Sequence, residues 1–269
     1  MKKLFIALSL LCLSHLASAQ STDETASLRN SALNKEEKSN YLGAIADYTK
    51  AIAIEPDEIN WYIWRADDFL EINDYANAIK DMNAAISLEP DNVQLYVNRS
   101  LIKKQNGDRA GAQTDDATVD SLRKKRIEEL STDLASDEYD LDLNKSMLSE
   151  RANLFVLMDQ FEKAIADWLT LSELAPEDSV EWYSRIGDVY KDFLKSDEKA
   201  VHYYTLAINS PADPDDYSKA MAHIERGAIR VAQGDIKAGC ADYRTGQRVL
   251  QKEWTDMLYR DLPECAKNK

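Results

Sequence analysis

The chain repeats itself at a spacing of 34 residues, and this period constrains its fold more than any other feature. The segment LGAIADYTKAIAIEP at 42–56 and the segment ANAIKDMNAAISLEP at 76–90 carry the same residue at seven of fifteen positions. A weaker copy, EKAIADWLTLSELAP, occupies 162–176. A fixed period of this length is typical of an array of stacked structural units, in which each unit packs against its neighbours.

Each copy has the pattern of one amphipathic helix. Ala44, Tyr48 and Ala51 lie at positions i, i+4 and i+7, which places them on one face of a helix. The alanines are small enough for two helices to cross closely. Pro56 ends the helix, because proline cannot continue the backbone hydrogen bonds. One helix cannot bury such a face alone, so each copy needs a partner helix and a neighbouring copy.

The composition favours an all-α fold. The 269 residues are 44% hydrophobic but include only 8 Gly and 6 Pro, too few turn formers for a β-sandwich or barrel. The apolar pattern and the turn residues predict about six helix pairs and a final helix. These helices are expected at 26–37 and 41–54, 61–72 and 75–88, 93–106 and 109 onward, 145–158 and 161–174, 180–193 and 198–209, 217–233 and 236–249, and 252–262.

The third pair departs from the pattern, because no proline follows its second helix and the chain runs on into a charged stretch. We therefore expect an extended helix and then an acidic connector between two halves of the array. The predicted division of the chain is a signal peptide at 1–19, a flexible N-terminus at 20–25, three repeats at 26–119, the extended helix and connector at 120–144, three repeats at 145–250, and a capping helix and tail at 251–269.

The first 19 residues have the pattern of a secretory signal peptide. Lys2 and Lys3 precede a mostly apolar run, and Ala17-Ser18-Ala19 provides a small-residue cleavage site. The sequence thus predicts an exported protein, periplasmic or secreted after cleavage near Ala19. No later segment contains the roughly 18 apolar residues that are needed to cross a bilayer.

The chain is strongly acidic. Cleavage of residues 1–19 would remove two lysines and no acids, which takes the formal net charge from −15 to −17. Such a surface repels nucleic acids and anionic lipid headgroups. We therefore expect no nucleic-acid partner. The simpler interpretation of the acidic charge is that it keeps the protein soluble.

The repeats resemble those of tetratricopeptide-repeat proteins. The resemblance is carried by the Ala-Ile-x-Asp-Tyr/Met/Trp runs, by the terminal prolines, and by first-helix pairs such as Tyr62 with Ala66. It covers roughly residues 26–250 and implies a right-handed α-solenoid of about six helix hairpins with a C-terminal capping helix. The last copy departs from the family pattern, because Gly239 and Gly246 stand where alanines usually sit. This departure brings the tightness of packing there into question.

An arginine is followed sixteen residues later by an aspartate in four copies. Across an antiparallel helix pair, this spacing places the two side chains opposite each other, so that the guanidinium can bind the carboxylate with two hydrogen bonds. Because the pairs occur once per copy and cannot converge, we interpret them as structural rather than catalytic. The pairs are Arg65 with Asp81, Arg99 with Asp115, Arg151 with Asp167, and Arg226 with Asp242.

Two cysteines, Cys240 and Cys265, would remain after cleavage of the signal peptide. An even pair in an oxidising compartment suggests a disulfide, which an antiparallel capping helix would bring together. The alternative is two unpaired thiols beside a frayed tail. Their spacing does not fit a zinc site, and we expect no metal and no cofactor.

The resemblance also implies where a partner would bind. In the family, partners usually lie in the concave groove formed by the first helix of each pair. The mixed lining that we expect here suits an amphipathic peptide or a partner helix with some positive charge. The simpler interpretation is that these side chains are merely exposed. The expected contacts are Arg29, Leu33, Ile63, Trp64, Asp67, Val97, Leu101, Lys104, Asn153, Ser184 and Asp188.

The sequence therefore predicts a non-catalytic scaffold of the bacterial cell envelope that binds another protein or peptide. No GxSxG, HExxH or nucleotide-binding motif occurs. Two alternatives stay open. One is a self-assembling subunit of an envelope or secretion machine. The other is a catalytic or carbohydrate-handling protein that uses the connector region, around residues 136–144.

Overall fold

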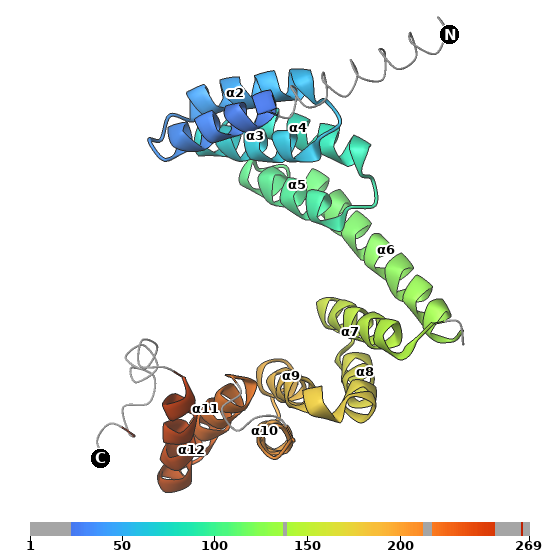
Figure 1. The fold of residues 1–269 in the computed structure, drawn as a ribbon, viewed down its shortest axis with the longest axis vertical. Helices are drawn as coiled ribbons and strands as arrows, with labels where there is room; N and C mark the ends of the chain where they lie inside the picture. The colour runs from blue at the N-terminus through green and yellow to red at the C-terminus, as the bar shows by residue number, and fades with distance from the viewer. Residues whose placement is uncertain (1–22, 137–138, 212–216, 251–264, 266–269) are drawn as a thin grey trace, which may run out of the picture. The chain divides into compact units, whose positions relative to one another are not determined.

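The computed structural model describes residues 23–136, 139–211, 217–250 and 265, and within them every regular element is a helix (Figure 1). A first helix covers residues 23–36. The others are α2 (Tyr41–Ile54), α3 (Ile59–Glu71), α4 (Tyr75–Leu88), α5 (Val93–Gln105), α6 (Arg109–Leu134), α7 (Leu141–Leu157), α8 (Phe161–Leu174), the 3-10 turn η1 (Pro176–Asp178), α9 (Ser179–Asp192), α10 (Asp197–Ile208), α11 (Tyr217–Ala232) and α12 (Ile236–Val249).

These helices form antiparallel hairpins, and within each of two units a hairpin packs against the next. The chain divides into two compact units between Lys125 and Arg126, within α6. In the first unit, the helix at 23–36 pairs with α2, α3 with α4, and α5 with the start of α6. In the second, α7 pairs with α8, α9 with α10, and α11 with α12, while the end of α6 packs beside α7 and α8. The all-helical repeat of hairpins is thus the fold that the 34-residue period predicts.

The turn inside each hairpin is built the same way, which explains why the hairpins are alike. One residue takes a positive φ and lets the chain reverse, and the residue after it precedes the second helix. Asp74 and Asp235 then cap their helices by accepting hydrogen bonds from backbone N–H groups of the first turn. The positive-φ residues are Ser39, Asn73, Gly107, Asp159, Lys195 and Gly234.

Alanines occupy the helix crossings, as the repeat pattern predicts. Ala44, Ala51, Ala78 and Ala85 are completely buried. Larger side chains fill the space between crossings, among them the buried Tyr48 of the first unit. The core is therefore a series of small clusters, each one shared between neighbouring helices.

The arginine–aspartate pairs lie where their spacing places them. Arg65 holds Asp81 with two hydrogen bonds of 2.8 and 2.7 Å, and its third nitrogen donates to Thr49 of the preceding hairpin at 2.9 Å. Each arginine therefore ties together helices of two consecutive hairpins. The same arrangement recurs at Arg99 with Asp115 and Asn83, at Arg151 with Asp167 and Ser131, and at Arg226 with Asp242 and Thr205.

The glycines of the last hairpin allow its two helices to pack closely, which answers the question that their place in the sequence raises. A Cβ atom on Gly246 would lie 2.4 Å from the backbone oxygen of Ala220, and one on Gly239 would lie 2.8 Å from that of Gly227. Helices α11 and α12 therefore approach so closely that no side chain fits at these positions. An alanine, the usual family residue, would be too large here.

Cys240 and Cys265 form a disulfide with a Cα–Cα separation of 5.2 Å. It links α12 to a residue 25 positions later in the chain. The predicted signal peptide at 1–19 and capping helix at 252–262 lie outside the described residues. Over the ranges that the structure does describe, no helix is both long enough and apolar enough to cross a membrane.

Candidate functional site: pockets between consecutive first helices

Two pockets, one in each unit, occur at the same kind of place in the repeat. Each is enclosed by the first helices of two consecutive hairpins and by a buried tyrosine from the second helix between them. The tyrosine is Tyr48 in the first unit and Tyr204 in the second. Both lie on the first-helix face, where the sequence predicts partner contacts.

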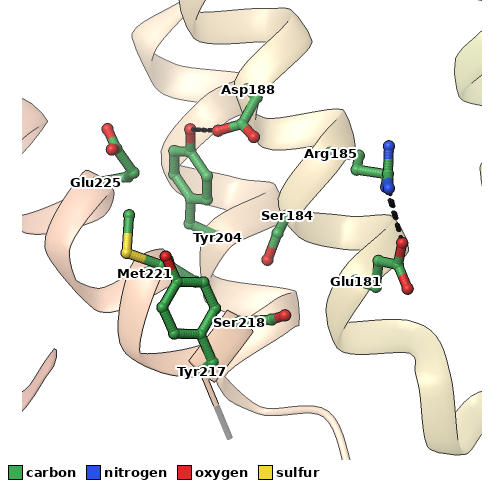
Figure 2. Close-up of a pocket in the computed structure, with 10 residues that line it drawn as sticks. Glu181, Ser184, Arg185, Asp188, Tyr204, Tyr217, Ser218, Met221 and Glu225 are labelled. Atoms are coloured by element: carbon green, nitrogen blue, oxygen red, sulfur yellow. Dashed lines mark hydrogen bonds and ion pairs between the residues drawn. The ribbon is translucent and has the colours of Figure 1, made fainter. Parts of the chain in front are cut away.

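The pocket of the second unit, called here the C-terminal pocket, has a volume of about 410 Å³. Figure 2 shows residues of α9 on one side and residues of α11 on the other, with Tyr204 of α10 between them. Its lining combines apolar, hydroxyl and charged groups. The lining residues are Glu181, Ser184, Arg185, Asp188, Tyr204, Tyr217, Ser218, Met221, Ala222 and Glu225.

A hydrogen bond from tyrosine to carboxylate forms the back of this pocket. The Tyr204 hydroxyl donates to Asp188 at 2.6 Å (Figure 2). Burial raises the pKa of Asp188, and this effect outweighs the hydrogen bond from Tyr204, which lowers it. The pKa of the Tyr204 hydroxyl is also raised, by burial and by its bond to Asp188. Tyr204 is thus held as a neutral donor, and its position is fixed.

Arg185 lines this pocket because the fifth copy lacks the aspartate that would bind it. The residue sixteen positions later is Val201, and the equivalent position holds Tyr203, which stacks on Tyr190 instead. Arg185 therefore bonds Glu181 on its own helix, at 2.8 and 3.0 Å (Figure 2). The break in the repeated ion pair leaves an arginine and a glutamate at the edge of the pocket.

Two further groups add to the polar character of the C-terminal pocket. Ser184 Oγ is buried and has no hydrogen-bond partner among the described residues. Across the pocket, Glu225 of α11 accepts a hydrogen bond from Lys191 of α9 at 2.8 Å, which joins the two walls. A ligand that offers a donor or an acceptor to Ser184 would satisfy this group.

The pocket of the first unit, called here the N-terminal pocket, has a volume of about 290 Å³ and is strongly acidic. The Tyr48 hydroxyl donates to Glu36 at 2.6 Å, a bond between tyrosine and carboxylate like that of the other pocket. The ring of Trp64 forms part of the wall. The lining residues are Leu33, Glu36, Tyr41, Tyr48, Trp64, Asp67, Asp68 and Glu71.

Asp68 is the unusual group of the N-terminal pocket. Its residue is 3% exposed, and Oδ2 is buried without a hydrogen-bond partner among the described residues. Burial, then the nearby carboxylates of Glu36, Asp67 and Glu71, raise the pKa of Asp68 to about 7. The other buried aspartates of the described chain each have a basic partner, namely Asp47 with Lys35 and the four aspartates paired with arginine.

The structure gathers about half of the expected groove residues into the two pockets. Leu33, Trp64 and Asp67 line the N-terminal pocket, while Ser184 and Asp188 line the C-terminal one. The guanidinium of Arg29 stacks over the Trp64 ring at 4.6 Å. Asp68 and the two tyrosine hydroxyls cannot be predicted as site groups from the sequence. The helical pattern of Tyr48 indicates only a core position, and the surroundings of Asp68 depend on three helices.

The remaining expected contacts lie elsewhere. Ile63 is partly buried and packs against two core clusters. Leu101 is 53% exposed, and Lys104 forms an ion pair with Asp116 at 2.9 Å. Val97 is half-buried on α5. Asn153 is exposed and accepts a hydrogen bond from Arg185 at 3.4 Å, next to the C-terminal pocket.

A third pocket lies on the connector side of the second unit, and its two charged side chains form an ion pair with each other. Ser131, Asn144 and Leu148 line it together with Arg151 and Asp167, which bind each other. No group of three or more metal-ligating side chains occurs in the described parts of the chain.

Comparison with known proteins supports the repeat. Residues 62–92, which include most of α3, all of α4 and the turn after it, match the tetratricopeptide repeat family model. No curated protein matches the chain significantly.

Several solved structures are similar at low identity. A tetratricopeptide repeat protein from Parabacteroides merdae is 16% identical, with 90% of this chain and 84% of that one covered and a TM-score of 0.42. The TPR domain of P58(IPK) is 19% identical, with coverage of 92% and 67% and a TM-score of 0.37. MamA from Desulfovibrio magneticus RS-1 is 14% identical, with coverage of 70% and 94% and a TM-score of 0.35. At TM-scores below 0.5, these likenesses say nothing of what this chain binds. The hairpins and the family match together identify a helical repeat protein that contains a tetratricopeptide repeat at residues 62–92.

Proposed function

We propose that this chain is a non-catalytic scaffold that binds a segment of another protein along its first-helix face. The observation that carries the proposal is the equivalent position of the two pockets, each between consecutive first helices and each closed by a tyrosine–carboxylate hydrogen bond. Within its own unit, each pocket suits a side chain of an extended or helical partner segment.

The chemistry of the pockets favours binding over catalysis. The N-terminal pocket has no serine, cysteine or histidine in its lining. The C-terminal pocket has Ser184 and Ser218 but no histidine beside them. Their aromatic, hydroxyl and carboxylate groups are those that recognise peptide side chains.

We propose further that the protein works in the bacterial cell envelope, or is secreted. The support is the signal-peptide pattern of residues 1–19 and the disulfide between Cys240 and Cys265. Disulfides persist in oxidising compartments and are rare in the cytosol.

Site-specific photo-cross-linking in cells tests the proposal. A benzoylphenylalanine replaces Leu33 of the N-terminal pocket or Met221 of the C-terminal pocket; the control replaces Leu42, which is 70% exposed on α2 and lines neither pocket. We expect both pocket positions to cross-link to the same partner, and a synthetic peptide of the cross-linked segment to compete. Equal labelling from Leu42, or products that consist only of the chain itself, would contradict the proposal; the second result would support the self-assembling alternative.

A further inference from the structure

The N-terminal pocket has a deficit of positive charge that none of the described residues balances with an ion pair. Four carboxylates line it, from Glu36 on the helix at 23–36 and from Asp67, Asp68 and Glu71 on α3. No lysine or arginine of the described residues forms an ion pair with any of them. Like charges gathered this closely repel one another, so the arrangement is unfavourable without a counter-charge.

Asp68 is a second and independent observation that points to a ligand. A buried carboxylate normally has a partner, because an unpaired charge out of water is costly. The buried Asp81 of the next helix shows the usual solution, with Arg65 held at 2.7 Å. Asp68 is equally buried, at 3% exposure for both residues, yet its Oδ2 receives no hydrogen bond from any described residue.

The aromatic wall restricts the kind of cation that fits. The rings of Trp64 and Tyr48 lie 5.9 Å apart, and both line the pocket. The Arg29 guanidinium lies over the Trp64 ring, 4.6 Å from its centroid. This ring is thus already used for a cation–π contact with an arginine. A small hydrated metal ion would gain nothing from such a wall, and the carboxylates do not form a metal-ligating cluster within the described ranges. A lysine or arginine side chain, by contrast, has an apolar stem for the rings and a charged end for the carboxylates.

We propose that the N-terminal pocket receives a lysine or arginine side chain of a partner protein, with its charged end at Asp68 and Glu36 and its stem against Trp64. This inference deepens the proposed function and rests on it, since it names the partner residue that one pocket selects. It requires that the bound segment carry a basic residue at the position that faces the start of the array.

Titration of the purified chain with short peptides tests the proposal by NMR. The probes are Ac-Gly-Ser-Lys-Ser-Gly-amide, its arginine analogue, and a norleucine analogue that keeps the stem but lacks the charge. We expect the two basic peptides to shift the Trp64 indole and the amides of α3, and the norleucine peptide to leave them in place. Equal shifts with norleucine, or shifts only with calcium chloride, would overturn the proposal.

Matched variants locate the charge that matters. Asp68→Asn and Glu36→Gln should each weaken binding of the lysine peptide at least tenfold. Glu37→Gln, an exposed neighbour outside the pocket with the same change of charge, should leave it within twofold. Equal losses in all three variants would reveal a general electrostatic effect and no pocket, and would also overturn the proposal.

Failure here can be told from failure of the scaffold function. If the photo-cross-links of Leu33 and Met221 reach one partner but the basic peptides do not bind, only the preference for a basic side chain is wrong. If those positions reach no partner, the scaffold function itself is wrong.

Discussion

At the scale of single residues, Asp68 is the group whose surroundings a sequence cannot reveal. It stands next to Asp67 on α3, and only the packing of three helices determines that one of the two is buried and the other exposed. The repeated arginine–aspartate spacing, in contrast, is predictable, because both partners lie at fixed positions of one hairpin. Each of these arginines also forms a hydrogen bond to the preceding hairpin, as Arg65 does to Thr49. The spacing within one pair does not predict this second contact.

The raised pKa of Asp68 predicts how stability depends on pH. Its pKa rises from an ordinary 3.8 to about 7 on folding. At a pH between these two values, the folded state therefore holds a proton that the unfolded state has lost. The free energy of unfolding should therefore fall as pH rises from 4 to 7, by up to about 4 kcal/mol from this group. Asp68→Asn should remove this fall and be the more stable form at pH 8. Urea unfolding at several pH values checks this; parallel curves for the two proteins would refute it.

The pair of Arg65 and Asp81 predicts a non-additive effect on stability. Arg65→Met leaves the buried Asp81 without a partner and should cost about 3–5 kcal/mol. The double variant with Asp81→Asn should be less destabilised than the single one, because no charge is then left unpaired. Thermal and urea unfolding of the wild type, the two single variants and the double variant give the comparison. Strictly additive losses would show that burial of the carboxylate does not matter.

At the scale of helices and hairpins, periodicity and turn residues predict most of the fold. Apolar residues at helical spacing locate the hairpins. The residue that reverses the chain can be identified from the sequence at Asn73, Gly107 and Gly234. Helix boundaries are less predictable where capping is involved. Helix α7 begins at Leu141 rather than at 145, because Asp140 caps it by accepting a hydrogen bond from the Leu143 N–H at 2.9 Å. The sequence also leaves the close approach of α11 and α12 open, since glycine in a helix is a poor indicator of tight packing.

The glycine contact of the last hairpin can be tested by adding one methyl group. Gly246→Ala would place a Cβ atom 2.4 Å from the Ala220 backbone oxygen, so the helices must separate. Although alanine has the higher helix propensity, we expect a loss of about 1–3 kcal/mol. Gly111→Ala is the control, because the three atoms nearest to its Cβ belong to the Asp108 side chain, which is exposed, and none of them is backbone. A gain in stability for Gly246→Ala would contradict the close contact.

At the buried alanines, a larger side chain is expected to overfill the helix crossing. Ala85 is 0% exposed and packs with Ile86, Leu95 and the rings of Tyr62 and Tyr96. Ala85→Trp should therefore destabilise the first unit by about 1–3 kcal/mol or more. Unchanged thermal unfolding would show that this helix crossing can accommodate the larger side chain.

At the scale of the whole molecule, the hairpins contact mainly their neighbours, so perturbations should stay local. Reduction of the disulfide between Cys240 and Cys265 opens a link that spans 25 positions and should cost about 3–4 kcal/mol in the chain-entropy account. Amide exchange should then accelerate in α11 and α12 and stay unchanged in α2 to α4. A uniform acceleration along the chain would mean that the two units unfold as one.

Binding of a partner segment to the first-helix face can be tested by amide hydrogen exchange of the chain with and without the segment found by cross-linking. We expect slower exchange in the helix at 23–36 and in α3, α9 and α11, which line the two pockets, and no change in α4, α8 and α12. Protection confined to the second helices, or no protection while the segment is bound, would contradict it.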